Sequence, residues 1–88
     1  MTYTLHYTAR AERSLSLLPK EEIIRIRDAL DELAAENDPG CHIRRLKGQK
    51  SLFSYRIGEY RAILTLDRGR FIIIVIEAGH RSSIYRKY

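Results

Sequence analysis

Residues 55–64 read YRIGEYRAIL and predict two β-strands joined by a tight turn. Gly58-Glu59 supplies the turn, and apolar residues alternate with polar ones on both sides of it. Arg56 and Arg61 flank this turn on neighbouring strands. Cross-strand partners have Cβ atoms about 5 Å apart, and diagonal partners about 7–8 Å apart. We therefore expect both guanidinium groups to reach one patch of the sheet surface.

The rest of the C-terminal half predicts an antiparallel meander around this hairpin. Strand-forming runs cover residues 52–57, 60–67 and 71–78, and Arg68-Gly69 supplies the second tight turn. The last run contains FIIIVI, which is apolar on both faces, as a central strand covered on both sides would be. The tail over residues 79–88 is too polar to belong to the core.

The N-terminal half predicts one strand and two helices. TYTLHYT at residues 2–8 alternates apolar and polar residues, which is typical of a half-buried strand. Thr8 can cap a helix over residues 9–18, and Pro19 separates it from a second helix over residues 20–36. The second helix repeats Ile and Leu at three- and four-residue steps, so these side chains share one face.

The expected order of elements is therefore βααβββ. This is an α+β fold in which two N-terminal helices pack on a small, mainly antiparallel sheet. Residues 1–88 are expected to form a single domain, because 88 residues leave no room for a second one. The first strand joins the sheet beside one strand of the meander, and the sequence leaves open which one.

Charge is distributed unevenly along the chain. Residues 1–38 contain five Lys or Arg and eight Asp or Glu, a balance of −3, whereas residues 39–88 contain eleven and three, a balance of +8. A one-sided basic surface concentrates polyanions and speeds their arrival. The pattern favours a polyanion or an acidic protein as the partner, and solubility alone is the alternative.

Several function classes are disfavoured by the sequence. The longest apolar run, residues 71–76, is too short to span a bilayer, and no secretory signal is recognisable, so a cytoplasmic protein without membrane contact is expected. Cys41 is the one cysteine, which excludes an intrachain disulfide and a Cys-based zinc site. His6, His42 and His80 lack metal-ligand spacing, so neither a metal nor another cofactor is expected.

Arginines and one tail tyrosine are the candidates for chemistry. Arg81 lies just past the last strand and can approach the patch that Arg56 and Arg61 share. Convergent arginines repel one another unless an anion lies between them, and each offers a planar fork that fits a phosphate. The alternative is that each arginine pairs with its own carboxylate on the surface. Tyr85 can stack on a nucleobase or fold back on the sheet edge.

Three motifs, RLKG at residues 45–48, YRIGEYRAIL at residues 55–64 and GHRSSIY at residues 79–85, together resemble the RelE/ParE superfamily of toxin–antitoxin toxins. The chain is more similar to the RelE branch. That resemblance implies a ribosome-dependent endoribonuclease that cuts mRNA and inhibits translation, whereas the ParE branch poisons DNA gyrase.

The resemblance carries site residues over by position. Arg61 matches the arginine that holds the scissile phosphate, Arg81 matches a second phosphate-binding arginine, and Tyr85 matches a tyrosine that stacks on the mRNA base. Arg56 falls at one of two basic positions on the strand before the turn. The other of these two positions is Ser54 here, which departs from the pattern and leaves Lys47 as a candidate to compensate.

The implied reaction is attack of an RNA 2′-OH on the adjacent phosphate without a metal. Fixed cations stabilise the charge that grows on the phosphate oxygens. Lys47 and His80 are equal candidates for the proton acceptor, and Arg45 and Lys50 are expected to bind RNA.

Expected partners are the ribosome, mRNA and a cognate antitoxin with an acidic or amphipathic segment. The Ser54 departure keeps a second function open. That alternative is a gyrase inhibitor, or a family member that binds without catalysis.

Overall fold

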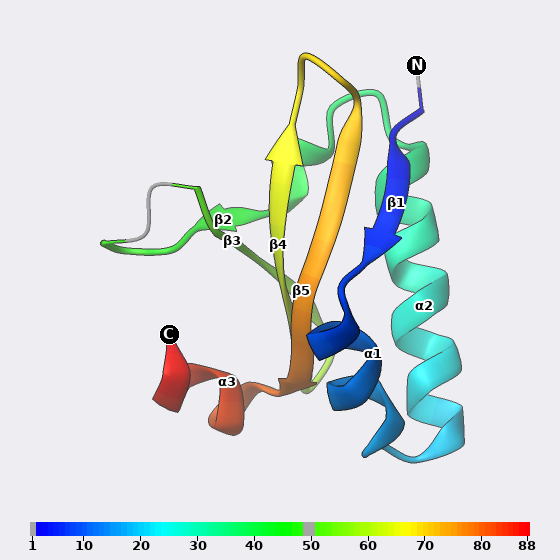
Figure 1. Ribbon diagram of the computed structural model, residues 1–88, viewed down its shortest axis with the longest axis vertical. Helices are drawn as coiled ribbons and strands as arrows, with labels where there is room; N and C mark the ends of the chain where they lie inside the picture. Colours follow the sequence, from blue (N-terminus) through cyan, green and yellow to red (C-terminus); the bar gives the residue numbers. More distant parts are fainter. Residues whose placement is uncertain (1, 49–50) are drawn as a thin grey trace.

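The computed structural model describes residues 2–48 and 51–88 of the chain (Figure 1). Lys50, one of the residues expected to bind RNA, lies outside this described part. The elements in chain order are β1 (Thr4–Tyr7), α1 (Ala9–Ser16), α2 (Lys20–Ala35), the 3₁₀ turn η1 (Pro39–His42), β2 (Arg44–Arg45), β3 (Phe53–Ile57), β4 (Tyr60–Asp67), β5 (Ile72–His80) and α3 (Arg81–Lys87).

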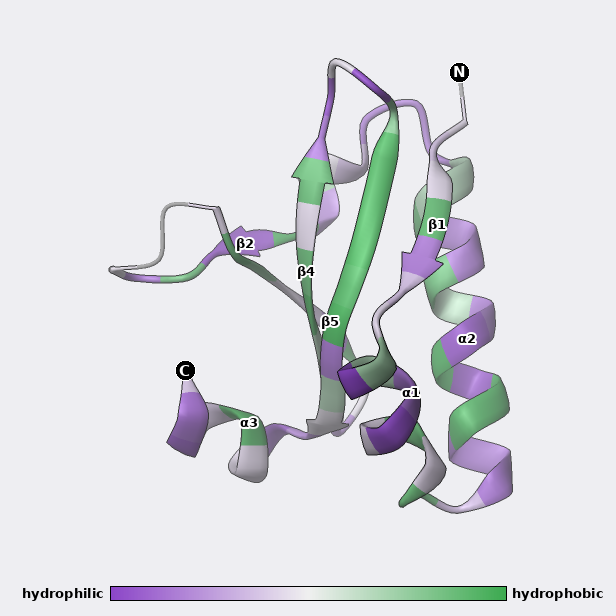
Figure 2. Cartoon of the chain, viewed as in Figure 1, coloured by the Kyte–Doolittle hydropathy of each residue, from purple (hydrophilic) through white to green (hydrophobic). Residues whose placement is uncertain are grey.

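The five strands form one mixed sheet in the order β1-β5-β4-β3-β2. The pairs β2–β3, β3–β4 and β4–β5 are antiparallel, and β1 runs parallel to β5 with Thr4 opposite Ile72. The expected α+β fold is confirmed, and the open question of the first strand is settled in favour of β5. Strand β5 lies between two neighbours, and its long apolar stretch is the continuous green segment of Figure 2.

Helices α1 and α2 cover one face of the sheet. Thr8 caps α1 as expected, since its Oγ1 accepts a hydrogen bond from the Ala11 backbone N–H at 3.1 Å. One buried apolar cluster fills the space between the helices and the sheet. The α2 stripe contributes Ile26, Leu30 and Leu33, which are all 1% exposed or less, and β4 and β5 contribute Leu64, Ile73 and Val75.

The opposite face of the sheet is covered at one end by α3, a helix that the sequence did not predict. The tail was expected to stay out of the core, yet Ile84 is only 3% exposed and lies over Gly79. Ile63, which alternates with the core residues Ala62 and Leu64, is fully buried on this face. Figure 1 shows α3 and the α1–α2 pair on opposite sides of β5. The prediction about the tail was therefore wrong.

Two further details correct the predicted meander. Strand β2, only two residues long, adds to the sheet where a basic loop was expected. The turn between β4 and β5 spans four residues, 68–71, because Asp67 Oδ1 accepts the Arg70 N–H and Phe71 adopts a left-handed φ of 56°. Among the described residues, no helix is both long and apolar enough to traverse a bilayer.

Candidate functional site

The candidate site lies on the sheet face that α1 and α2 leave uncovered. Arg56 of β3 pairs directly with Arg61 of β4 across the ladder, as the hairpin prediction required. Ser54 shares this face, because it lies two residues before Arg56 on the same strand. Both arginines and the serine therefore belong to one patch, which α3 borders on one side.

Arg61 is held in place by two neighbours. Its Nη1 donates a hydrogen bond of 2.9 Å to Ser54 Oγ, and its guanidinium carbon lies 4.8 Å from the centre of the Tyr85 ring. A cation above an aromatic face is attracted by the ring quadrupole. The Arg61 Nε is buried and has no hydrogen-bond partner among the described residues. The guanidinium is thus oriented by the protein and keeps an unsatisfied donor.

A first hollow, of ≈ 270 Å³, opens beside Arg61. We call it the arginine pocket, and it is lined by Cys41, His42, Ile43, Arg44, Ser54, Arg56 and Arg61. It contains three guanidinium groups and no carboxylate among the described residues. Arg44 enters the pocket because β2 pairs it directly opposite Ser54.

A second hollow, of ≈ 240 Å³, is also lined by Arg61 and by residues of α3. We call it the tyrosine pocket, and it is lined by Arg44, Arg45, Leu46, Lys47, Ser54, Arg61, Ile84, Tyr85 and Tyr88. Three of the predicted site residues, Arg45, Lys47 and Tyr85, therefore meet Arg61 here. Arg44, Ser54 and Arg61 line both pockets.

Arg81 and His80 lie apart from both pockets among the described residues. The Arg81 Nε and the His80 Nε2 are each 4.0 Å from a Glu59 carboxylate oxygen, and the Arg81 N–H donates to the Glu59 carbonyl. The His80 ring also caps α3 through Ser82. For Arg81 the structure therefore favours the surface-pairing alternative over convergence with Arg61.

Glu77 anchors the last turn of α3 to the sheet. Its side chain is 5% exposed, and it accepts hydrogen bonds from the Tyr88 hydroxyl at 2.9 Å and from Lys87 Nζ. Arg10 of α1 reaches the same carboxylate at 3.3 Å. Burial by itself raises the pKa of Glu77. Hydrogen bonds from Lys87 and Tyr88 and the charges of Lys87 and Arg10 outweigh it, so this pKa lies below its ordinary value.

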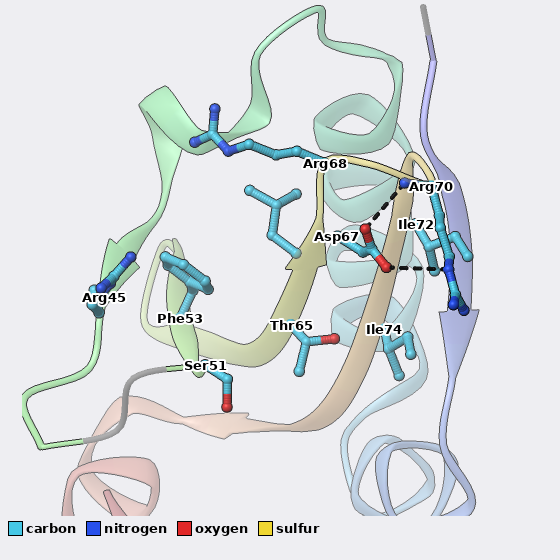
Figure 3. A pocket seen from close by; sticks show the side chains of 10 residues that line it. Arg45, Ser51, Phe53, Thr65, Asp67, Arg68, Arg70, Ile72 and Ile74 are labelled. Atoms are coloured by element: carbon cyan, nitrogen blue, oxygen red, sulfur yellow. Dashed lines mark hydrogen bonds and ion pairs between the residues drawn. The ribbon is translucent and has the colours of Figure 1, made fainter.

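A third hollow, larger at ≈ 650 Å³, lies toward the β4–β5 turn (Figure 3). Two of its three arginines are paired with carboxylates, because Arg70 contacts Asp67 and Arg68 contacts Asp38. Ile72 and Ile74 contribute apolar surface to it, and Figure 3 shows Arg45 and Phe53 on the opposite side. Its size exceeds that of the arginine pocket, but its charges are less available to an anion.

Arg44 and His42 are the site residues that the sequence did not reveal. A two-residue strand has too few positions to show alternation, so nothing in the sequence pattern places Arg44 opposite Ser54. His42 is the last residue of a 3₁₀ turn, and no sequence motif predicts its place in the site. Within residues 2–48 and 51–88, no three His, Cys, Asp or Glu side chains gather closely enough to hold a metal ion.

The fold and this arginine-rich sheet face define a small α+β protein with a basic surface patch. The family model described as ParE toxin of type II toxin-antitoxin system, parDE, matches residues 5–85. Toxin RelG of Mycobacterium tuberculosis is 32% identical over 90 residues, covering 99% of this chain and all of that protein. This chain therefore belongs to the RelE/ParE superfamily of type II toxin–antitoxin toxins.

Solved structures agree with this assignment. The toxin–antitoxin complex RelBE2 of Mycobacterium tuberculosis contains a chain with a TM-score of 0.84 and 25% identity, and the match covers 93% of this chain and 94% of that one. The archaeal RelE–RelB complex of Pyrococcus horikoshii gives a TM-score of 0.73 and 26% identity, covering 92% and 97%. The first of these structures is a toxin–antitoxin complex, and the second is a complex of RelE with RelB.

Proposed function

We propose that this toxin is an endoribonuclease that cleaves mRNA on the ribosome and so inhibits translation in the cytoplasm. The observation that carries the proposal is that Arg61 lines both the arginine pocket and the tyrosine pocket. A phosphate in the first pocket and its nucleobase in the second would both contact this one side chain. Such an arrangement fits a single nucleotide of RNA.

The arginine pocket supplies the electrostatic part of the reaction. The RNA 2′-oxygen attacks the adjacent phosphorus while the bond to the 5′-oxygen breaks, leaving a 2′,3′-cyclic phosphate and a free 5′-OH. Negative charge grows on the phosphate oxygens during this step. Arg56 and Arg61 line the pocket, which supports a role for their guanidinium groups in stabilising that charge. The reaction in this form needs no metal, because the guanidinium groups carry the positive charge.

The tyrosine pocket supplies the binding surface for the base. Tyr85 already stacks against Arg61 and is 59% exposed, so its free face can receive a nucleobase. Arg45 and Lys47 line the same pocket and can contact the neighbouring phosphates. The role proposed for Arg81 is weaker, since it would have to leave Glu59 to reach the RNA.

Two side chains near Arg61 can take the proton from the 2′-OH. Lys47 lines the tyrosine pocket, and His42 lines the arginine pocket. The His42 Nε2 lies 3.9 Å from a Glu36 carboxylate oxygen, so the ring would have to turn away from Glu36 to reach the RNA. Imidazole exchanges protons readily near neutral pH, which favours His42 over an ammonium group. A second proton must reach the leaving 5′-oxygen, and water or the protonated imidazole can deliver it.

The test is translation in vitro with primer extension on the mRNA. Arg61→Ala should lower the cleavage rate by about 10²–10³, as expected for loss of one charge-stabilising contact. Arg13→Ala is the matched control, because Arg13 is exposed on α1, away from this face. Arg61→Ala protein that folds normally and cleaves at the wild-type rate would contradict the proposal.

Inhibition of DNA gyrase is the second candidate function, favoured by the match to the ParE toxin family model. A supercoiling assay with purified gyrase separates the two functions. Inhibition of gyrase without mRNA cleavage would favour this candidate.

The antitoxin is expected to contribute an acidic segment that covers the basic face, because three unneutralised arginines gather there.

A further inference from the structure

Ser54 leaves the phosphate site one cation short of the pattern that the family resemblance implies. Its hydroxyl instead accepts a hydrogen bond from Arg61, and the residue is 5% exposed. A cation at this position would repel the Arg61 guanidinium rather than hold it. Ser54 therefore orients Arg61 but contributes no positive charge to the phosphate site. If the site is to bind a phosphate as strongly, another residue must supply that charge.

Arg44 stands directly across the ladder from Ser54. Paired residues point to the same face of a sheet, with Cβ atoms about 5 Å apart, so Arg44 projects onto the patch that contains Arg61. It lines both the arginine pocket and the tyrosine pocket. Its side chain is exposed, and the described part of the chain places no carboxylate within 4.0 Å of it.

Arg44, Arg56 and Arg61 thus share one pocket without a counter-charge from a carboxylate. Like charges this close raise the free energy of the empty site, and an anion among them lowers it. An anion with several acceptor oxygens, such as a phosphodiester, offsets this repulsion and accepts hydrogen bonds from the guanidinium groups that line the pocket.

We propose that Arg44 is a phosphate-binding residue that replaces, from the neighbouring strand, the cation absent at position 54. The inference rests on the proposed function for the identity of the anion, a phosphate of single-stranded RNA. The positive charge is thus supplied from β2 instead of from position 54 on β3. Ser54 then orients Arg61, and Arg44 restores the charge of the site.

Salt-dependent binding tests this inference apart from cleavage. The probe is a short single-stranded RNA oligonucleotide carrying 2′-O-methyl groups, which cannot undergo attack by the 2′-oxygen. Arg44→Ala should reduce the slope of log K against log salt concentration by about 0.7, the value for one lost phosphate contact on a single strand. Arg13→Ala, an exposed arginine on α1, should leave the slope unchanged.

A double variant that moves the positive charge from position 44 to position 54 tests the inference more directly. Adding Ser54→Lys to Arg44→Ala returns a cation to position 54, and we expect it to recover the lost slope and part of the cleavage rate. A purely structural role for Arg44 would not be repaired in this way. Arg44→Gln removes the charge but keeps the Cβ and Cγ methylene groups and a polar amide, so it replaces Arg44→Ala if that variant does not fold.

Each outcome is informative. A wild-type slope in both Arg44→Ala and Arg44→Gln overturns the inference, and so does failure of the wild-type protein to bind the oligonucleotide. If the wild type cleaves mRNA and these variants cleave equally well, the inference fails while the endoribonuclease function stands. If binding depends on Arg44 but the wild type cuts no mRNA on ribosomes, the phosphate site stands and the proposed reaction fails.

Discussion

Arg61 owes its position to a serine on the adjacent strand. The 2.9 Å hydrogen bond to Ser54 Oγ and the Tyr85 ring constrain the guanidinium from two directions. A side chain with this many rotatable bonds loses considerable entropy when a ligand orders it. Because Ser54 and Tyr85 have already restricted Arg61, less of that entropy remains to be lost when RNA binds.

The position of His42 leads to a prediction about the proton acceptor. His42→Ala should lower mRNA cleavage by about 10²-fold, since a placed general base contributes at least that much. His80→Ala should have a smaller effect, because the His80 ring caps α3 and lies outside both pockets. His6→Ala, exposed on β1, is the control for loss of an imidazole. A greater loss of mRNA cleavage in His80→Ala than in His42→Ala would instead identify His80 as the proton acceptor.

The residues of the hairpin could be predicted because their positions follow from local rules. A Gly-Glu turn fixes the register, and the register places Arg56 opposite Arg61. Arg44 and Arg81 could not be placed in this way. The position of Arg44 depends on a two-residue strand paired across a long loop, and that of Arg81 depends on its backbone bond to Glu59 at the start of an unexpected helix.

Helix α3 depends on a single carboxylate at its C-terminal end. Lys87, Tyr88 and Arg10 all contact Glu77, which is buried on β5. This cluster ties α3 to α1 as well as to the sheet. Since α3 carries Tyr85, the Glu77 cluster also sets the distance between the Tyr85 ring and Arg61.

Stability should therefore depend on pH through Glu77. Its pKa is lowered in the folded protein, so the ionised carboxylate stabilises the fold above the ordinary glutamate pKa of about 4.3, and this contribution is lost as the pH falls through the lowered value. Glu77→Gln should reduce the free energy of unfolding by about 1–3 kcal/mol at neutral pH. The difference from wild type should shrink toward about pH 3.

Urea denaturation of both proteins at the two pH values measures this difference. Asp28→Asn, which removes an exposed carboxylate from α2, controls for a general change in net charge. A difference between Glu77→Gln and wild type that stays constant over this pH range would show that the Glu77 charge does not stabilise the fold.

Elements with strong periodicity could be predicted closely, and elements without it could not. Helix α2 was expected over residues 20–36 and occupies Lys20–Ala35, because its Ile and Leu side chains repeat on one face. Helix α3 contains one buried apolar residue, Ile84, in a polar stretch. Its stability comes from contacts with Gly79 and Glu77, which lie on β5 rather than in its own sequence.

The two faces of the sheet divide the molecule into a stabilising side and a functional side. The main apolar cluster lies between the sheet and helices α1 and α2, and it includes no residue of α3. The functional face carries Arg44, Arg56 and Arg61 and is covered only in part, by α3. The sequence showed the corresponding separation of charge, since the segment that forms α1 and α2 is acidic and the segment that forms the site is basic.

This division predicts that the chain folds without α3. A variant that ends at His80 loses the burial of Ile84, worth about 2–3 kcal/mol, and the contacts of Lys87 and Tyr88 with Glu77, worth about 1–3 kcal/mol. The total stability is about 5–10 kcal/mol. It should keep a cooperative unfolding transition and the far-UV circular dichroism of α1, α2 and the sheet. It should not cleave mRNA, because Tyr85 is gone and Arg61 has lost the ring that orients it.

Leu30→Ala provides the comparison, since Leu30 is fully buried in the main cluster. We expect it to cost about 2–5 kcal/mol while the candidate site keeps all of its side chains. Urea denaturation and primer extension on both variants separate the two contributions, because truncation removes activity from a folded chain and Leu30→Ala lowers stability with the site intact. An unfolded truncated chain would mean that α3 belongs to the core, and that the two faces of the sheet form one cooperative unit.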